Sequence, residues 1–294
     1  MSKVALIIIY NHQYNKNIDI LEKIYKERFS TIYHLVPFYS GKKENVIPVY
    51  ESSFYFQGYI SQGLKTFYNE NCEHYFFIAD DMILNPIVTE NNYREILNLN
   101  SNSSYIPRLD SIHKFWKDYN VKVEKAYKFN PNAKGVEVKN ILPSYEEALK
   151  LLNDHGVEIG KLSLNQISNS GYSRLFAPLL KHFKIYQLPY PLTSSYADIC
   201  IVSSTAIKDF ALYCGIFAAL DLWVEVALPT ALAFSARDIV KDAQLKIKGR
   251  ALWSESDYKL LEKYENNLSK LLSSFPKEYL YLHPIKLSKW STEL

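Results

Sequence analysis

Two adjacent aspartates, Asp80 and Asp81, are the residues whose types and spacing most directly indicate chemistry. They follow a largely apolar run over 74–78 that is typical of a buried strand. Neighbouring carboxylates at a strand end repel each other and lose hydration, so they are stable where a cation or a ribose hydroxyl meets them. The alternative is a helix cap or a turn ahead of Asn85 and Pro86.

A second pair of acids, Asp221 and Glu225, interrupts the long apolar stretch 210–236. They are four residues apart, so on a helix both would share one face. An unpaired buried charge is costly, and Glu225 must therefore meet a partner, a proton or a ligand. An ion pair with an arginine inside the fold, such as Arg237 or Arg174, is the structural alternative.

The elements that must position these acids begin with a continuous apolar run over 4–10, as expected for a parallel strand covered on both faces. Helical spacing follows over 15–28 and strand character over 30–38, and 56–68 predicts a helix that leads into the strand ending at Asp80. The acidic pair would then lie at the carboxyl end of a sheet strand, where open α/β sheets bind ligands. The predicted fold is therefore α/β, a Rossmann-type mixed sheet flanked by helices.

The rest of the chain is predicted to complete one domain, 1–294, without an interdomain linker. Residues from about 91 to 172 are polar and weakly periodic, and we interpret them as an insertion that covers the site. Within it, Ser144 and Glu147 form a capping box for a helix that Gly156 would end. The later predicted elements are a strand over 197–203, a helix over 206–220 capped by Ser204, a helix over 222–236, an amphipathic helix over 254–275 and a strand over 279–283.

Composition excludes several classes of protein. The 294 residues are 48% hydrophobic, enough for a real core, and 34 basic against 31 acidic residues give a net charge of +3, too weak to favour nucleic acid. Three cysteines without C-x-x-C spacing indicate neither a disulfide framework nor a structural zinc site, which fits a reducing cytoplasm. No uninterrupted apolar window of about 18 residues predicts a membrane span, and the first apolar run lacks a following cleavage site.

Several catalytic motifs are missing from the sequence: the P-loop pattern, G-x-G-x-x-G after the first strand, G-x-S-x-G and H-E-x-x-H. The missing motifs therefore argue against four classes of protein: P-loop NTPases, NAD enzymes, α/β-hydrolases and zinc peptidases.

In the order of its parts the chain resembles bacterial, nucleotide-sugar-dependent glycosyltransferases of the GT-A fold. The resemblance covers most of the chain in layout but only short patches in motif. Ala79, Asp80 and Asp81 look like the D-x-D motif of that family, although Ala79 replaces the first acidic residue found in many members. The resemblance implies Asp81 as a ligand of Mg²⁺ or Mn²⁺ and Asp80 as a ribose or second metal contact, and a metal-independent member is the alternative.

The same resemblance implies roles for four further residues. Glu225 would be the base that deprotonates the acceptor hydroxyl, and Asp221 is the second candidate for that role. His283 looks like the late histidine that some members add as a metal ligand, and Lys286 would neutralise diphosphate charge. A lone histidine is also often a satisfied core or surface residue.

Tyr10 and Asn11, at the end of the first strand, lie where the family holds the nucleotide. The tyrosine ring would stack on the base and the asparagine would donate or accept hydrogen bonds, while ordinary strand-end packing is the alternative. Aromatic and basic residues near the C-terminus, including Trp290, are expected to favour peripheral contact with a membrane.

The resemblance implies a cytoplasmic transferase in polysaccharide biosynthesis, acting at the inner membrane face. It would move a sugar from a nucleotide-diphosphate donor to a glycan or a lipid-linked acceptor. A sugar nucleotidyltransferase is the first alternative, although Tyr10-Asn11-His12-Gln13 stands where such enzymes carry a glycine-rich, basic loop. A non-catalytic glycan-binding protein on a transferase fold is the second.

Overall fold

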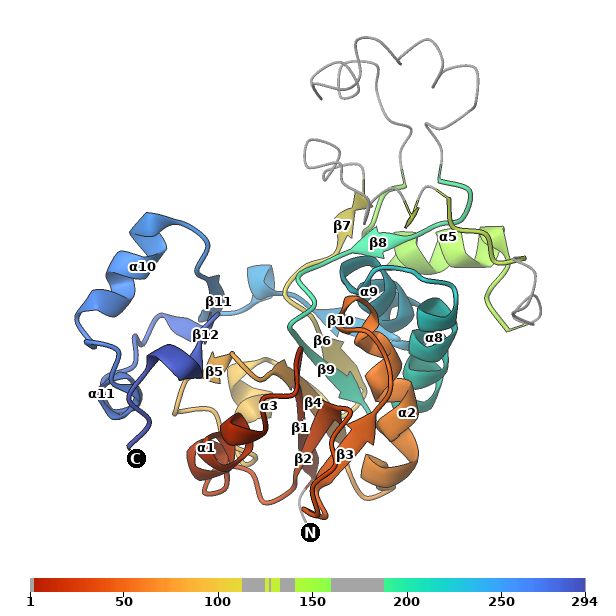
Figure 1. The fold of residues 1–294 in the computed structure, drawn as a ribbon. Helices are drawn as coiled ribbons and strands as arrows, with labels where there is room; N and C mark the ends of the chain where they lie inside the picture. The colour runs from red at the N-terminus through yellow and green to blue at the C-terminus, as the bar shows by residue number, and fades with distance from the viewer. Residues whose placement is uncertain (1–2, 113–124, 127, 133–140, 160–187, 294) are drawn as a thin grey trace, which may run out of the picture.

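The computed structural model describes residues 3–112, 125–126, 128–132, 141–159 and 188–293, and its centre is a seven-stranded mixed sheet (Figure 1). The predicted α/β class is therefore confirmed. Across the sheet the strands are β10 (Asp238–Val240), β6 (Ser103–Tyr105), β9 (Ile199–Ser203), β4 (His74–Ala79), β1 (Val4–Ile9), β2 (Ile32–Pro37) and β3 (Val46–Val49).

The predicted strands 4–10, 30–38 and 197–203 correspond to β1, β2 and β9. All six residues of β1 are buried, as expected for a strand with both faces covered. β1 pairs in parallel with β2 and β4, whereas β9 runs antiparallel to β4. The sequence did not predict β3, a short edge strand in which Pro48 is exposed, the position in a sheet where proline is tolerated.

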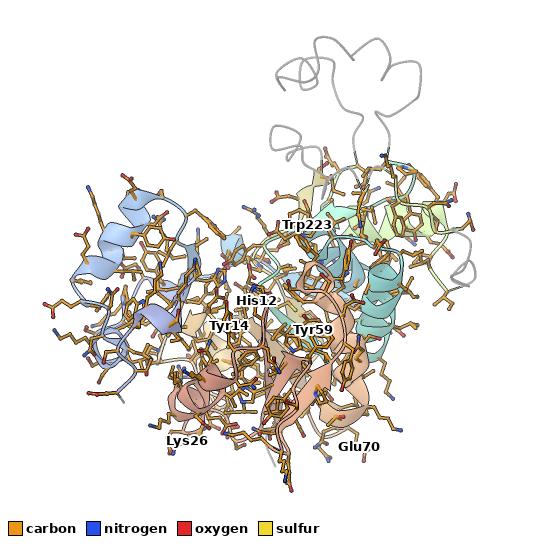
Figure 2. The ribbon with its side chains drawn as sticks, viewed as in Figure 1. His12, Tyr14, Lys26, Tyr59, Glu70 and Trp223 are labelled. Carbon is orange, nitrogen blue, oxygen red and sulfur yellow. The ribbon has the colours of Figure 1, made fainter. Side chains whose placement is uncertain are left out.

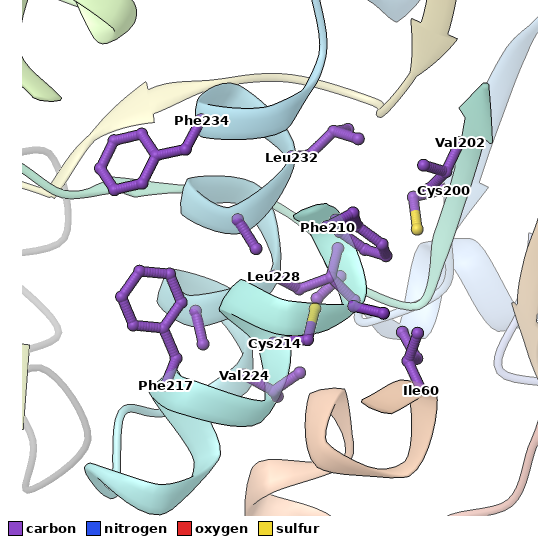
Figure 3. Close-up of a cluster of buried hydrophobic side chains, with 14 of the residues drawn as sticks. Ile60, Cys200, Val202, Phe210, Cys214, Phe217, Val224, Leu228, Leu232 and Phe234 are labelled. Atoms are coloured by element: carbon purple, nitrogen blue, oxygen red, sulfur yellow. The ribbon is translucent and has the colours of Figure 1, made fainter. Parts of the chain in front are cut away.

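Helices cover both faces of the sheet. On one face, α2 (Gln57–Phe67), α8 (Ile207–Ala219) and α9 (Val224–Ser235) pack together, with α8 against β9 and α2 against β2 and β3, and on the other lies α1 (Asn15–Tyr25). Figure 3 shows the first of these cores, where Phe210, Cys214 and Leu228 meet Ile60 and Cys200. Within the described ranges, no helix has both the length and the apolar character needed to cross a bilayer.

The predicted helices 206–220 and 222–236 are confirmed as α8 and α9, but the predicted cap is wrong. Ala206 occupies the N-cap position of α8, and no side chain caps the helix. Ser204 lies two residues earlier, where its backbone N–H donates a hydrogen bond to the Glu73 carbonyl at 2.8 Å.

A small second sheet joins two distant parts of the chain. β12 (Tyr279–His283) pairs antiparallel with β5 (Ile83–Leu84) and parallel with β11 (Lys248–Ala251). β5 begins two residues after Asp81, so this pairing brings the end of β12 next to the end of β4. The other short elements are the sheet β7 (Asp110–Ser111) with β8 (Thr193–Ser194), and the 3-10 helices η1 (Ser53–Tyr55), η3 (Asp242–Gln244) and η4 (Leu287–Lys289).

The predicted long helix 254–275 is in fact two helices. Ser254 caps α10 (Glu255–Glu262), and α11 (Leu268–Ser273) follows a break. Glu265 and Asn266 have φ of 50° and 52°, a left-handed conformation that ends a right-handed helix. Glutamate rarely adopts that conformation, so periodicity alone predicted one continuous helix.

The segment 91–172 contributes directly to the sheet through β6, which follows the short α3 (Tyr93–Ile96). The predicted helix is confirmed as α5 (Tyr145–Asp154), with the Ser144 capping box at its start and Gly156 at φ 76° after its end. Much of the rest lies outside the described residues, so the interpretation of this segment as an insertion stays a prediction.

A buried histidine in the sheet, His74, is expected to make the stability of the fold depend on pH. His74 Nδ1 lies 2.8 Å from the Tyr93 hydroxyl and Nε2 lies 3.0 Å from the Ser103 carbonyl, and burial lowers the pKa of His74. In the unfolded chain His74 therefore becomes protonated near pH 6.5, whereas in the folded chain it stays neutral at that pH. Compared with His74→Gln, the wild type should lose up to about 1.4 kcal/mol more unfolding free energy per pH unit below about 6.5.

Urea unfolding of both proteins between pH 7.5 and 5.5 measures this difference. The comparison with His74→Gln removes the contributions of other titrating groups, which both proteins share. Parallel curves for the two proteins would show that His74 does not stay neutral in the fold.

Candidate functional site

The acidic pair lies at the carboxyl end of β4, as predicted, and the two carboxylates face different surroundings. Asp80 is 2% exposed and accepts a hydrogen bond from Asn17 Nδ2 at 2.9 Å and another from the backbone N–H of Asn11. Burial, and then the charge of Asp81, raise the pKa of Asp80 to about 7. Asp80 therefore ties the end of β1 and the start of α1 to β4.

Asp81 faces His283, which comes from the end of β12. Asp81 Oδ1 and His283 Nε2 form an ion pair at 2.8 Å, but their geometry is not that of a hydrogen bond, and neither buried atom has a hydrogen-bond partner among the described residues. The other ring nitrogen of His283, Nδ1, lies against the Tyr196 hydroxyl. A histidine oriented through one nitrogen, with the other facing a carboxylate, is arranged as a metal ligand is.

Asp198, which the sequence analysis did not single out, adds a third carboxylate. Its Oδ1 lies 3.9 Å from His283 Nε2, and burial raises its pKa against the opposing effect of His283. The Asp198 carbonyl accepts a hydrogen bond from the Ala79 N–H at 2.9 Å, which aligns β9 beside β4. In the sequence, Asp198 is recognisable only as an acid just before a buried strand. The antiparallel pairing of β9 with β4, which brings Asp198 to the site, cannot be predicted from the sequence of either strand.

The electrostatics of this cluster favour a cation. Burial alone would lower the pKa of His283, but Asp81 and Asp198 outweigh it, and the net effect is to raise that pKa. Within the described part of the chain, no lysine or arginine forms an ion pair with Asp80, Asp81 or Asp198. The carboxyl groups of Asp81 and Asp198 thus face one imidazole in a desolvated place, with Asp80 next to Asp81.

The predicted metal ligands are brought together only in part. Of the predicted metal set, Asp81 and His283 come together, while Asp80 Oδ2 is bound by Asn17. Among the described residues, no group of three or more His, Cys, Asp or Glu side chains is arranged to hold a metal ion. Mg²⁺ commonly binds through one or two carboxylates together with substrate phosphates and water, so a site of that kind needs few protein ligands.

The structure separates the second pair of acids. Glu225 lies half-buried in the first turn of α9, and its carbonyl accepts a hydrogen bond from the Ser195 N–H at 3.0 Å. Asp221 does not share its helical face, because α9 begins only at Val224. It lies in the preceding loop at φ 57°, 68% exposed on its side chain.

The predicted nucleotide contacts have different outcomes. Tyr10 is fully buried, with its hydroxyl 2.8 Å from His34 Nδ1, so its ring has no free face for a base and the stacking prediction is wrong. Asn11 is partly exposed and bonds to Asp80 through its backbone N–H. His12 and Tyr14 follow at the same end of the sheet (Figure 2).

Lys286 and Trp290 belong to the C-terminal part of the fold. The Ile285 N–H donates a hydrogen bond to the Asp81 carbonyl at 2.6 Å, so the backbone of the next residue, Lys286, lies near the site. Its exposed side chain lines a separate cavity of about 480 Å³ between α10 and the C-terminal tail. Trp290 lines the same cavity and is only 9% exposed, so it is not a free aromatic for a membrane surface.

A scan against models of known protein families gives no match, and a search of curated proteins finds no significantly similar sequence.

Proposed function

We propose that this protein is a metal-assisted glycosyltransferase that moves a sugar from a nucleotide-diphosphate donor to a hydroxyl of a glycan or lipid-linked acceptor. One observation carries the proposal. Asp81 Oδ1 and His283 Nε2, both buried and without hydrogen-bond partners, lie 2.8 Å apart at the carboxyl end of a sheet strand. The Asp81 carboxylate and the phosphate oxygens of the donor are hard oxygen ligands, which favour Mg²⁺ or Mn²⁺ over softer ions.

Each residue of the site has a defined part in this proposal. A bound cation would stabilise the negative charge that develops on the leaving diphosphate. Asp81 and His283 would hold it, and Tyr196 keeps the imidazole in the required orientation. Asp80 accepts hydrogen bonds from the Asn11 N–H and from Asn17 Nδ2 and so fixes the end of β1 and the start of α1, where the nucleoside would bind.

Glu225 is the proposed general base. Its carboxylate would take the proton of the acceptor hydroxyl while that oxygen attacks the anomeric carbon of the donor. The bond between this carbon and the phosphate oxygen breaks, and its electron pair leaves with the diphosphate. Glu225 lies half-buried in the first turn of α9, and its carbonyl accepts a hydrogen bond from the N–H of Ser195, the residue before Tyr196, which supports the assignment.

Calorimetry with nucleoside diphosphates tests the proposal without knowledge of the sugar. UDP, GDP, ADP and CDP are titrated into the protein with and without Mn²⁺. At least one should bind about tenfold or more tightly when Mn²⁺ is present, because the cation links the diphosphate to Asp81 and His283. A protein that binds none of the four, with or without the metal, is no nucleotide-sugar enzyme, and the glycan-binding alternative would then be favoured.

A further inference from the structure

Trp253 lies in the short segment between β11 and α10, and it is 68% exposed. Its backbone is nevertheless fixed. The Trp253 N–H donates a hydrogen bond to Asp257 Oδ2 at 3.1 Å, and the Leu252 N–H donates to the His283 carbonyl at 2.7 Å. A rigid backbone therefore presents a large aromatic side chain to solvent.

The indole lies next to the candidate metal site. The Trp253 and His283 ring centroids are 6.2 Å apart, with an interplanar angle of 73°, an edge-to-face arrangement. His283 is the residue whose Nε2 faces Asp81. By contrast, the neighbouring Tyr281 is buried and stacks on Tyr196, and Trp290 is buried in the C-terminal tail. Trp253 is thus an exposed aromatic one side chain away from where the diphosphate would bind.

We propose that Trp253 is the stacking surface for the pyranose ring of the acceptor, an inference that rests on the proposed function. The donor is anchored by charge, through its diphosphate, and by the polar groups at the end of β1. An acceptor sugar has no charge for the site to hold. Its apolar C–H face can be held by an aromatic face, and its hydroxyls by hydrogen bonds.

The position of Trp253 separates it from the donor groups. Asn11 and Asn17 belong to the β1–α1 region of the main sheet, whereas Trp253 follows a strand of the small second sheet (Figure 1). Asp81 and His283 lie at the junction of the two sheets. An acceptor resting on Trp253 would therefore approach the reacting carbon from a different element than the one that holds the nucleoside.

Saccharide binding in solution tests this inference independently of turnover. Methyl glycosides of glucose, galactose, mannose and N-acetylglucosamine are the probes, and saturation-transfer NMR measures binding to wild type, Trp253→Ala and Trp253→Phe. Trp253→Ala should weaken binding of the preferred glycoside at least tenfold, and Trp253→Phe should retain most of it because it keeps an aromatic face. Tyr258→Ala is the matched control, since Tyr258 is a half-exposed aromatic on α10 that lines the separate cavity beside Trp290.

The outcomes distinguish this inference from the proposed function. Equal glycoside binding by wild type and Trp253→Ala, or no binding by either, overturns the role of Trp253. Weaker nucleotide binding by Trp253→Ala would place the donor on the indole and also overturn it. If the wild type binds a glycoside through Trp253 but binds no nucleoside diphosphate with Mn²⁺, the transferase proposal fails while the sugar-binding role of Trp253 stands.

Discussion

Asp81→Asn is expected to lower the rate of sugar transfer at least about 100-fold and to abolish the Mn²⁺-dependent part of nucleotide binding. Asparagine has the shape of aspartate but lacks the charge that would hold the cation beside His283. The fold should survive, because the substitution also removes a repulsion that helps to raise the pKa of Asp80. Steady-state kinetics, calorimetry with Mn²⁺ and urea unfolding measure the three effects together.

Asp80→Asn is the matched control for this experiment. Asp80 is the neighbouring carboxylate, but it is 2% exposed and bonded to Asn17 and to the backbone of Asn11. Its replacement should change the unfolding free energy more than the affinity for Mn²⁺. If Asp81→Asn kept full turnover, or if both variants lost Mn²⁺ binding equally, Asp81 would not be the specific metal ligand.

The parts of this fold that sequence predicted are those set by local periodicity. The apolar run of β1, the stripe of α1 and the strand that ends at Asp80 each follow from patterns within about ten residues. The break between α10 and α11 did not follow, because Glu265 adopts a left-handed conformation unusual for its type. Local patterns describe an element well until one residue departs from its usual backbone conformation.

The candidate site depends instead on pairing between distant segments. His283 reaches Asp81 because β12 pairs with β5, some 200 residues away in sequence, and Asp198 reaches the same place because β9 runs antiparallel to β4. Neither pairing can be predicted from the residues of one strand alone. Tyr10 was misjudged for the same reason, since its burial depends on a hydrogen-bond partner, His34, on another strand.

Glu225→Gln is expected to lower kcat for transfer by about 10²- to 10⁴-fold while leaving nucleotide and Mn²⁺ binding within about twofold. Glutamine keeps the size of the side chain in the first turn of α9 but cannot accept the acceptor proton. A base also leaves a pH signature. The rise of kcat/KM with pH that reports deprotonation of this carboxylate should be lost in the variant.

Asp221→Asn separates a base from a general charge effect. Asp221 lies close by in sequence but is exposed, in the loop before α9 with Lys125 Nζ 3.7 Å away, so its replacement should change kcat by less than about twofold. A hydrolysis assay adds a second reading, because water can replace the acceptor hydroxyl and also needs a base. Comparable kcat values for Glu225→Gln and Asp221→Asn would mean that Glu225 is a structural partner on α9, and that deprotonation of the acceptor depends on another group.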